Sequence, residues 1–201
     1  YNVEDLTGDG TDDIIFTRVH YTSPQGDIGT QLMDGDSGAS SPLTLLTAQD
    51  DTNYSFTTSL TYGRFALNSP LGFAYGSPFV SFPFEDNGAV YFLNDTGNFN
   101  FFLGAPYYGA ANQDEVGLSL ATLLRPTQAT DVLLIGANSQ IIYLNAATGT
   151  EGTLTIPLPD LYVGSGLAAT RVPQSDGTYR VWLSGISEGR GDSKIWIYSA
   201  R

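Results

Sequence analysis

Oxygen-bearing side chains recur at short spacing near the start of the chain, in residues 5–13, which read D-L-T-G-D-G-T-D-D. Calcium prefers about six to eight oxygen ligands, and a short acidic loop that turns sharply at a glycine can supply most of them. We predict a Ca²⁺ site whose ligands are the side chains of Asp5, Thr7, Asp9 and Asp13 and the carbonyl oxygen of Thr11. The loop is too short for an EF-hand, and the alternative is an acidic surface turn without a metal.

The same residues carry a family resemblance. Together with the apolar run Ile14-Ile15-Phe16 that follows, the loop resembles the calcium loop of FG-GAP repeats. These repeats form the blades of the β-propeller in integrin α-subunits and in related bacterial and fungal proteins. The resemblance implies an all-β fold, a β-propeller in which the loop joins two strands and its calcium ion is structural. Thr7 departs from the Asn or Asp that is usual at its position.

Composition limits the classes of partner. The chain has 201 residues and a net charge of −13, with 21 acidic and 8 basic residues. Nucleic acids and anionic membranes both require clustered Lys and Arg, so we expect neither as a partner. No apolar run approaches the length of a membrane span. Cysteine is absent, so no disulfide links the fold.

Enzymatic chemistry has little support in these residues, and we predict that the chain is not an enzyme. His20 is the only histidine and is expected at the end of a strand, as a packed or surface residue rather than a base. There is no cysteine and no Gly-x-Ser-x-Gly elbow. A pair of carboxylates for glycoside hydrolysis remains an alternative, because several acids fall in expected loops. These acids are Glu85, Asp86, Asp114, Glu115 and Glu188.

The elements that position these residues are predicted to be short β-strands. Gly and Pro (23 and 10 residues) interrupt the chain every few positions, and no window sustains the apolar period of a long helix. A similar strand recurs at 29–34, 88–94, 140–145 and 194–199, and the first three are followed by turns that end in Gly38, Gly97 and Gly149. Repeats near 50 residues built from several strands indicate a propeller.

About four blades are therefore expected, within one domain, at approximately 1–57, 58–112, 113–160 and 161–201. Small-residue segments at 116–121 and 164–168 resemble the first strand of an FG-GAP repeat, and 131–137 resembles the strand after the calcium loop. Only the first repeat keeps the calcium ligands. Because a fourth strand is missing from the last repeat, we expect a fragment of a larger propeller, or a ring completed by another chain. A complete four-bladed propeller is the competing interpretation.

Three further features bear on binding. Arg190-Gly191-Asp192 lies at an expected hairpin tip and matches the tripeptide that integrins recognise, although such a triplet also makes a good turn. Asn53 and Asn94 begin N-glycosylation sequons, which matter in a secreted eukaryotic glycoprotein. Loop aromatics could stack on sugar rings or on a partner protein, although packing explains most of them; these are Tyr107, Tyr108 and Tyr162.

The function predicted from these features is binding. We expect an extracellular or cell-surface, calcium-stabilised β-propeller that acts as a protein-binding, cell-adhesion or surface-assembly module. Function would lie in the loops rather than in the fold. The alternatives are a lectin-like propeller that binds carbohydrate, or the non-catalytic part of a polysaccharide-active enzyme.

Overall fold

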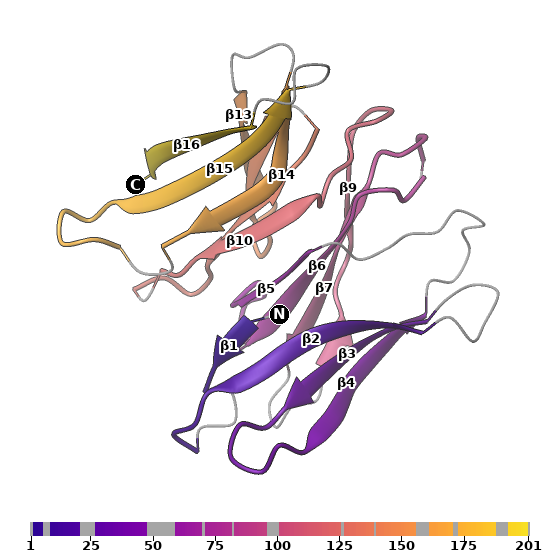
Figure 1. Cartoon of the computed structure of the whole chain (residues 1–201), viewed down its shortest axis with the longest axis vertical. Helices are drawn as coiled ribbons and strands as arrows, with labels where there is room; N and C mark the ends of the chain where they lie inside the picture. The colour runs from indigo at the N-terminus through magenta and orange to yellow at the C-terminus, as the bar shows by residue number, and fades with distance from the viewer. Residues whose placement is uncertain are drawn as a thin grey trace.

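The structure is a computed structural model, and all its regular elements are β-strands. It describes residues 2–5, 9–20, 27–47, 59–69, 71–81, 83–95, 101–125, 127–138, 140–155, 161–170, 173–187 and 193–200. Within these ranges the chain forms sixteen strands and no helix (Figure 1). The strands make four antiparallel sheets, which follow one another along the chain. The expected all-β class is therefore confirmed.

The first sheet contains four strands in chain order. They are β1 (Asn2–Glu4), β2 (Asp13–His20), β3 (Asp27–Met33) and β4 (Ser40–Thr47). The second sheet has the same order through its first four strands, with a short fifth strand paired to β7. They are β5 (Ser59–Gly63), β6 (Gly72–Ser77), β7 (Ala89–Asp95), β8 (Phe101–Leu103) and β9 (Tyr107–Tyr108).

The third and fourth sheets continue the pattern. The third is made of β10 (Ser119–Leu123), β11 (Val132–Gly136), β12 (Gln140–Asn145) and β13 (Thr150–Thr155). The fourth has three strands among the described residues: β14 (Leu161–Ala169), β15 (Tyr179–Ser187) and β16 (Ser193–Ala200). Apart from β9, which pairs with β7, each sheet is thus a simple meander in which neighbours in sequence are neighbours in space.

The turn from β3 to β4 in the first sheet has the same geometry as the turn from β12 to β13 in the third sheet. The amide of Gly38 donates to the carbonyl of Asp34 at 2.8 Å, and the amide of Gly149 donates to that of Asn145 at 2.9 Å. Both glycines have positive φ, +65° and +66°, a conformation that glycine adopts without a Cβ penalty. This shared geometry explains why the turn could be recognised as a repeat in the sequence.

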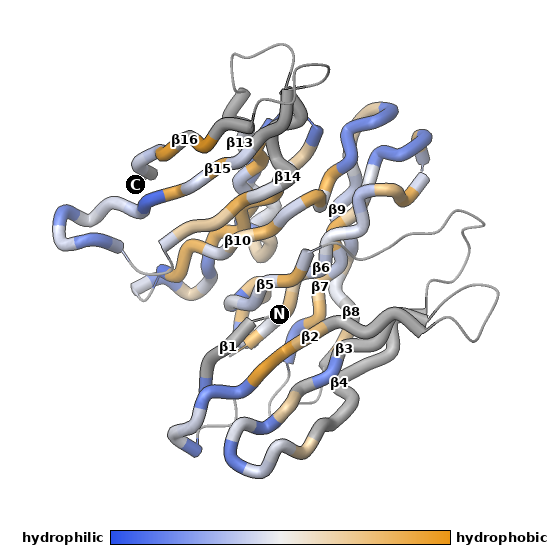
Figure 2. The backbone as a smooth tube through the Cα atoms, in the orientation of Figure 1, coloured by the Kyte–Doolittle hydropathy of each residue, from blue (hydrophilic) through white to orange (hydrophobic). Residues whose placement is uncertain are grey.

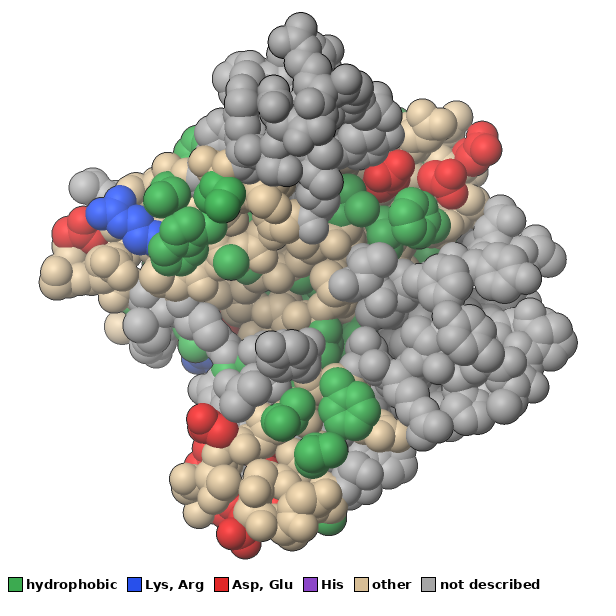
Figure 3. Space-filling view, viewed as in Figure 1, with side chains coloured by type: hydrophobic (Ala, Val, Ile, Leu, Met, Phe, Trp, Pro, Cys, Tyr) green, Lys and Arg blue, Asp and Glu red, His purple; other side chains and the backbone are tan. Residues whose placement is uncertain are grey.

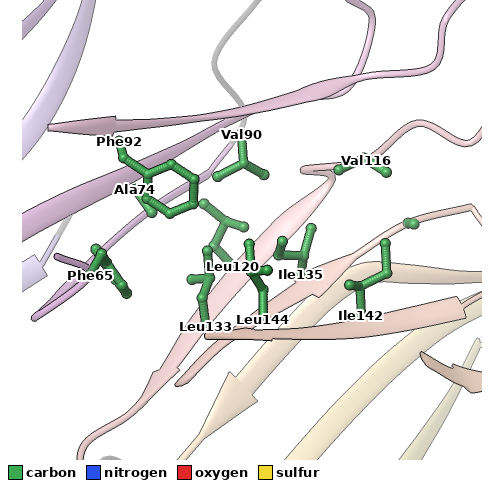
Figure 4. Packing of buried hydrophobic residues seen from close by; sticks show 11 residues of the cluster. Phe65, Ala74, Val90, Phe92, Val116, Leu120, Leu133, Ile135, Ile142 and Leu144 are labelled. Atoms are coloured by element: carbon green, nitrogen blue, oxygen red, sulfur yellow. The ribbon is translucent and has the colours of Figure 1, made fainter. Parts of the chain in front are cut away.

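The four sheets are stacked face to face, with an apolar cluster between each successive pair. Between the first two sheets Ile15 packs with Phe73 and Tyr75, among others. Between the second and third, Phe65 and Phe92 meet side chains of β10, β11 and β12 (Figure 4). A third cluster joins β10–β12 to β15. Apolar residues accordingly concentrate on the strands, while the turns are hydrophilic (Figure 2).

Strand alternation makes the third sheet apolar on both faces. In β11, Leu133 and Ile135 pack toward the second sheet, and Leu134 between them packs toward the fourth. Successive side chains in a strand point to opposite faces, so a strand that is buried on both sides must be apolar throughout. The continuous run Val-Leu-Leu-Ile in β11 is the sequence record of this position.

The first strands of the sheets contact one another in chain order. β1 contacts β5, β5 contacts β10, and β10 contacts β14. No strand pair from the first and fourth sheets makes a comparable contact within the described ranges, so the stack is an open arc as far as it is described.

One expected strand begins later than its sequence suggests. The small-residue segment 116–121 is predicted to be extended throughout, whereas β10 begins only at Ser119. Val116 instead forms an isolated parallel bridge with Gly88, and its amide donates to the carbonyl of Asn87 at 3.1 Å. Gly117 follows with a φ of +97°, which is incompatible with a regular strand.

Candidate functional site

The candidate calcium loop joins β1 to β2 and is held by hydrogen bonds from backbone amides to carboxylates. The two carboxylate oxygens of Asp5 accept from the amides of Asp9 and Gly10, at 3.1 and 2.9 Å. Asp9 in turn accepts from the amide of Thr11 at 2.8 Å. The sharp turn falls at Gly10, whose φ is +93°. Asp and Asn favour such turns because their side chains bond to the backbone a few residues away.

Asp13, the first residue of β2, is fully buried and links the loop to the β3–β4 turn. Its Oδ1 accepts from the amide of Gly35 at 3.0 Å. The two loops approach closely, since a Cβ added to Gly35 would lie 2.1 Å from the carbonyl oxygen of Asp12. Asp34 and Asp36 in this turn therefore lie at the same end of the first sheet as the candidate loop. Acidic side chains gather at that end (Figure 3).

The donor chemistry of the β1–β2 loop fits a calcium ion. Carboxylate and backbone carbonyl oxygens are the ligands that Ca²⁺ takes, and each ionised carboxylate offers about four acceptor positions. The bonds to backbone amides therefore leave acceptor capacity. In the described part of the chain, however, no three Asp, Glu or His side chains are grouped closely enough to hold a metal. Calcium binding would require the loop to draw Asp5, Asp9 and Asp13 together, with Thr7, which lies outside the described residues.

In the third sheet, the aspartate that precedes the second strand forms an ion pair with an arginine. Asp131 immediately precedes β11, is fully buried, and pairs with Arg64, whose Nη2 lies 2.7 Å from Oδ1. Arg64 Nε donates to Oδ2 at 3.2 Å, and the amides of Arg64 and Arg125 donate at 2.8 and 2.7 Å. Burial alone would raise the pKa of Asp131, but these hydrogen bonds outweigh it and hold that pKa below its usual value.

The same pair raises the pKa of Arg64, chiefly through its hydrogen bonds to Asp131. Arg64 follows β5 in the second sheet, so the ion pair joins the second sheet to the third. The Nη2 of Arg64 also donates to the carbonyl of Arg125 at 2.7 Å. The sequence shows the loss of calcium ligands before β11, but nothing in it indicates that an arginine from the preceding sheet pairs with the remaining acid.

The residues of the Arg-Gly-Asp motif and the two sequon asparagines are either outside the described residues or buried. Arg190, Gly191, Asp192 and Asn53 lie outside them. Asn94 lies in β7 and its side chain is 4% exposed. An attached glycan would have to project into solvent, so we do not propose glycosylation at Asn94.

Four of the acids considered for catalysis lie in two adjoining loops. The amide of Gln113 donates to the carbonyl of Glu85 at 2.9 Å, and the amide of Glu115 to that of Asp86 at 3.1 Å. Asp86, Gln113 and Glu115 all have positive φ, between 45° and 59°. Burial, and then the charge of Asp86, raise the pKa of Glu115. Positive φ angles like those of Asp86, Gln113 and Glu115 are uncommon for residues other than glycine. Glu188 lies outside the described residues.

Clefts open between neighbouring sheets in the described part of the chain, and two of them have sizes suited to a ligand. One, of about 400 Å³, lies between the second and third sheets. Its lining includes Phe102, Tyr107 and Asn94, and the buried Oδ1 of Asn94 has no hydrogen-bond partner in the described part of the protein. Burial raises the pKa of Tyr107, and its hydrogen bond to Glu151 adds to the effect. The other cleft, of about 560 Å³, lies between the third and fourth sheets.

Comparison with known proteins found no protein-family model that matches this chain and no similar protein among those with a curated function. The described residues include no helix with the length and apolar character that crossing a bilayer requires.

Proposed function

We propose that this chain is a segment of a β-propeller of FG-GAP type, extracellular or at the cell surface, and that it acts by binding another protein. One observation carries the propeller fold in this proposal: successive meander sheets contact one another through their first strands, β1 to β5 to β10 to β14. In a propeller the first strand of each blade lies nearest the axis, so this order of contacts is the one that the fold requires. The apolar clusters between neighbouring sheets support the same arrangement.

Calcium has a structural role in this proposal. The β1–β2 loop supplies Asp5, Asp9 and Asp13, and Asp13 also binds the β3–β4 turn through Gly35. When bound, the ion would neutralise carboxylates that otherwise repel one another. The loop and the turn would then form one rigid end of the first sheet. Loops that are fixed in this way can present a binding surface with little loss of conformational entropy.

Exposed apolar side chains on the fourth sheet support the proposal of protein binding. Ile195 and Ile197 on β16 are 72% and 63% exposed, and apolar side chains gather over the fourth sheet in Figure 3. Exposed apolar patches rimmed by polar residues mark sites of protein interaction. Assembly with another chain, or with further blades, is one form that this binding would take.

The experiment is a binding screen of the purified chain against a panel of extracellular matrix proteins, by biolayer interferometry with calcium and with EGTA. We expect saturable binding to at least one protein that weakens on chelation. Absence of binding to every protein of the panel, together with strong signals on a glycan array, would contradict the proposal and favour its alternative.

That alternative is carbohydrate binding, and the cleft between the second and third sheets favours it. Aromatic rings stack on the apolar faces of sugars, and an amide recognises their hydroxyl groups. Phe102 is 46% exposed at this cleft, beside Tyr107 and Asn94. Phe102→Ala would abolish glycan-array signals if this cleft is the sugar site, whereas Phe79→Ala, an exposed phenylalanine that does not line the cleft, would leave them unchanged.

A further inference from the structure

The cleft between the third and fourth sheets has the size of a ligand site. Its volume is about 560 Å³, within the range of roughly 300–1,000 Å³ that small-molecule pockets occupy. Protein interiors are otherwise close-packed, and few voids exceed the size of a water molecule. Several of its lining residues, among them Ile141 and Leu183, also belong to the apolar cluster between the same two sheets, so the cleft is continuous with that cluster. An opening of this size next to packed apolar side chains is large enough to hold a small molecule.

The walls of the cleft are apolar and aromatic. Side chains of the third sheet form one wall, those of the fourth sheet form the other, and three tyrosines stand among them. The lining residues are Leu123, Val132, Leu134, Ile141, Tyr143, Tyr179, Val181, Leu183, Tyr198, Ser199 and Arg125.

Several polar groups of these walls form hydrogen bonds within the protein. The hydroxyl of Tyr179 donates to the carbonyl of Leu124, and the hydroxyl of Ser199 accepts from Arg180. Tyr143 lies over the backbone of Gly152, because a Cβ added there would meet its ring. The cleft thus offers rings and aliphatic side chains held in fixed positions, with few polar groups to bind a sugar.

Arg125 is the exception, and it is the sole charged residue among the described residues that line the cleft. Its backbone is fully used: the amide donates to Asp131 and the carbonyl accepts from Arg64. Its guanidinium is not used in the same way. The Nε is buried without a hydrogen-bond partner, and the one ion pair of the described chain joins Arg64 to Asp131.

An arginine with no acidic partner among the described residues is unexpected in a protein whose net charge is −13. A buried donor that lacks a partner costs about 1–3 kcal/mol, more when it is charged. An anionic group at this end of the cleft would remove that cost and accept hydrogen bonds from the guanidinium in the forked geometry that arginine favours.

We propose that this cleft binds a small molecule with an apolar, ring-containing or aliphatic body and one anionic head group, with the body between the two sheets and the head group on Arg125. This site depends neither on calcium nor on closure of a propeller ring. Its ligand class differs from the protein and glycan ligands considered above.

The test uses two probes that differ in charge, the aromatic sulfonate 8-anilinonaphthalene-1-sulfonate and neutral N-phenyl-1-naphthylamine, with fluorescence titration of the whole chain. We expect saturable binding of both, with the sulfonate bound more tightly. Arg125→Gln should weaken the sulfonate at least tenfold and change the neutral probe less than twofold. Arg18→Gln is the matched control, because Arg18 lies on β2 in the first sheet, which contributes no residue to the cleft, and it should alter neither probe.

Two further measurements keep the proposal falsifiable if Arg125→Gln does not fold. In the wild-type chain, raising the salt concentration should weaken the sulfonate and not the neutral probe, since salt screens the charged contact. Methyl nuclear magnetic resonance should show shifts on Leu134, Val181 and Leu183 when either probe binds. The proposal is overturned if binding of the sulfonate does not saturate, or if the chemical-shift changes fall outside the cleft. It is also overturned if neither Arg125→Gln nor added salt changes the affinity for the sulfonate.

Discussion

Arg64 and Asp131 join two neighbouring sheets through a buried, doubly hydrogen-bonded ion pair. The Nη2–Oδ1 distance is 2.7 Å and the Nε–Oδ2 distance is 3.2 Å. Asp131 is fully buried, whereas the Arg64 side chain is 29% exposed, so the cation reaches the carboxylate from the surface. The pair therefore satisfies an acid that the fold has removed from water.

Removing Arg64 should destabilise the chain substantially. Loss of one partner of a buried ion pair costs about 3–5 kcal/mol, because the remaining charge is left without compensation. We expect about 3 kcal/mol for Arg64→Ala, at the lower end because Arg64 is partly exposed, measured by urea denaturation. Arg180→Ala, which removes a side chain hydrogen-bonded to Ser199 and leaves no buried carboxylate unpaired, should cost much less. Equal costs for the two variants would refute this interpretation.

The Arg64–Asp131 pair should also make stability depend on pH in the acid range. The pKa of Asp131 is lower in the folded state than the value of about 3.9 expected when unfolded. Its contribution is therefore complete above about pH 5 and is lost as pH falls below about 4 toward the folded pKa. The difference in unfolding free energy between wild type and Asp131→Asn should shrink across that interval. A constant difference from neutral pH to about pH 3 would count against it.

Glu115 should behave in the opposite sense. Burial and the charge of Asp86 raise its pKa, so the folded state disfavours the ionised form. That destabilisation is absent at low pH and appears as pH rises through the folded pKa. Glu115→Gln should therefore raise the urea midpoint at neutral pH, by an amount equivalent to about 0.5 kcal/mol. The exposed Glu85, changed to Gln, is the control, and an equal gain there would show that the effect is not local.

Calcium should stabilise the folded chain through the β1–β2 loop. A ligand that binds only the folded state contributes about 2.7 kcal/mol at a hundredfold excess over its dissociation constant. Asp9→Ala should abolish the gain in melting temperature on adding calcium. Asp12→Ala, an exposed acid of the same loop outside the predicted ligand set, should retain it. Identical melting of wild type with calcium and with EGTA would remove the case for a structural ion.

Two glycines of the β3–β4 turn should differ in their tolerance of a methyl group. A Cβ at Gly38 meets no atom within 4 Å, so Gly38→Ala should cost only the positive-φ penalty of about 1–2 kcal/mol. A Cβ at Gly35 would lie 2.1 Å from the backbone of Asp12 and force the two loops apart. Gly35→Ala should cost roughly 2–3 kcal/mol, and it should also weaken any calcium response. Equal unfolding midpoints for the two variants would show that the loops are not in contact.

Much of the fold follows from the sequence, because strands and turns leave local patterns. The strands at 140–145 and 88–94 were predictable from alternating β-branched and aromatic residues, and Gly149 from its turn. Contacts between sheets leave no such pattern. The pairing of Arg64 with Asp131 joins residues 67 positions apart, and the strained backbone at Glu115 depends on the adjoining loop. The grouping of Asp34 and Asp36 with the candidate calcium loop is likewise set by tertiary structure.

The third sheet, apolar on both faces, has a consequence for how the chain opens. Neither face can be exposed without loss of a whole cluster, on one side with Phe65 and Phe92 and on the other with Tyr179 and Val181. Stacked units of this kind gain stability from their nearest neighbours, so a unit held from both sides, as the second and third sheets are, separates later than a unit at the end of the stack. Amide protons of β11 should accordingly exchange with solvent only when the stack dissociates, while those of the less covered β16 exchange through local opening.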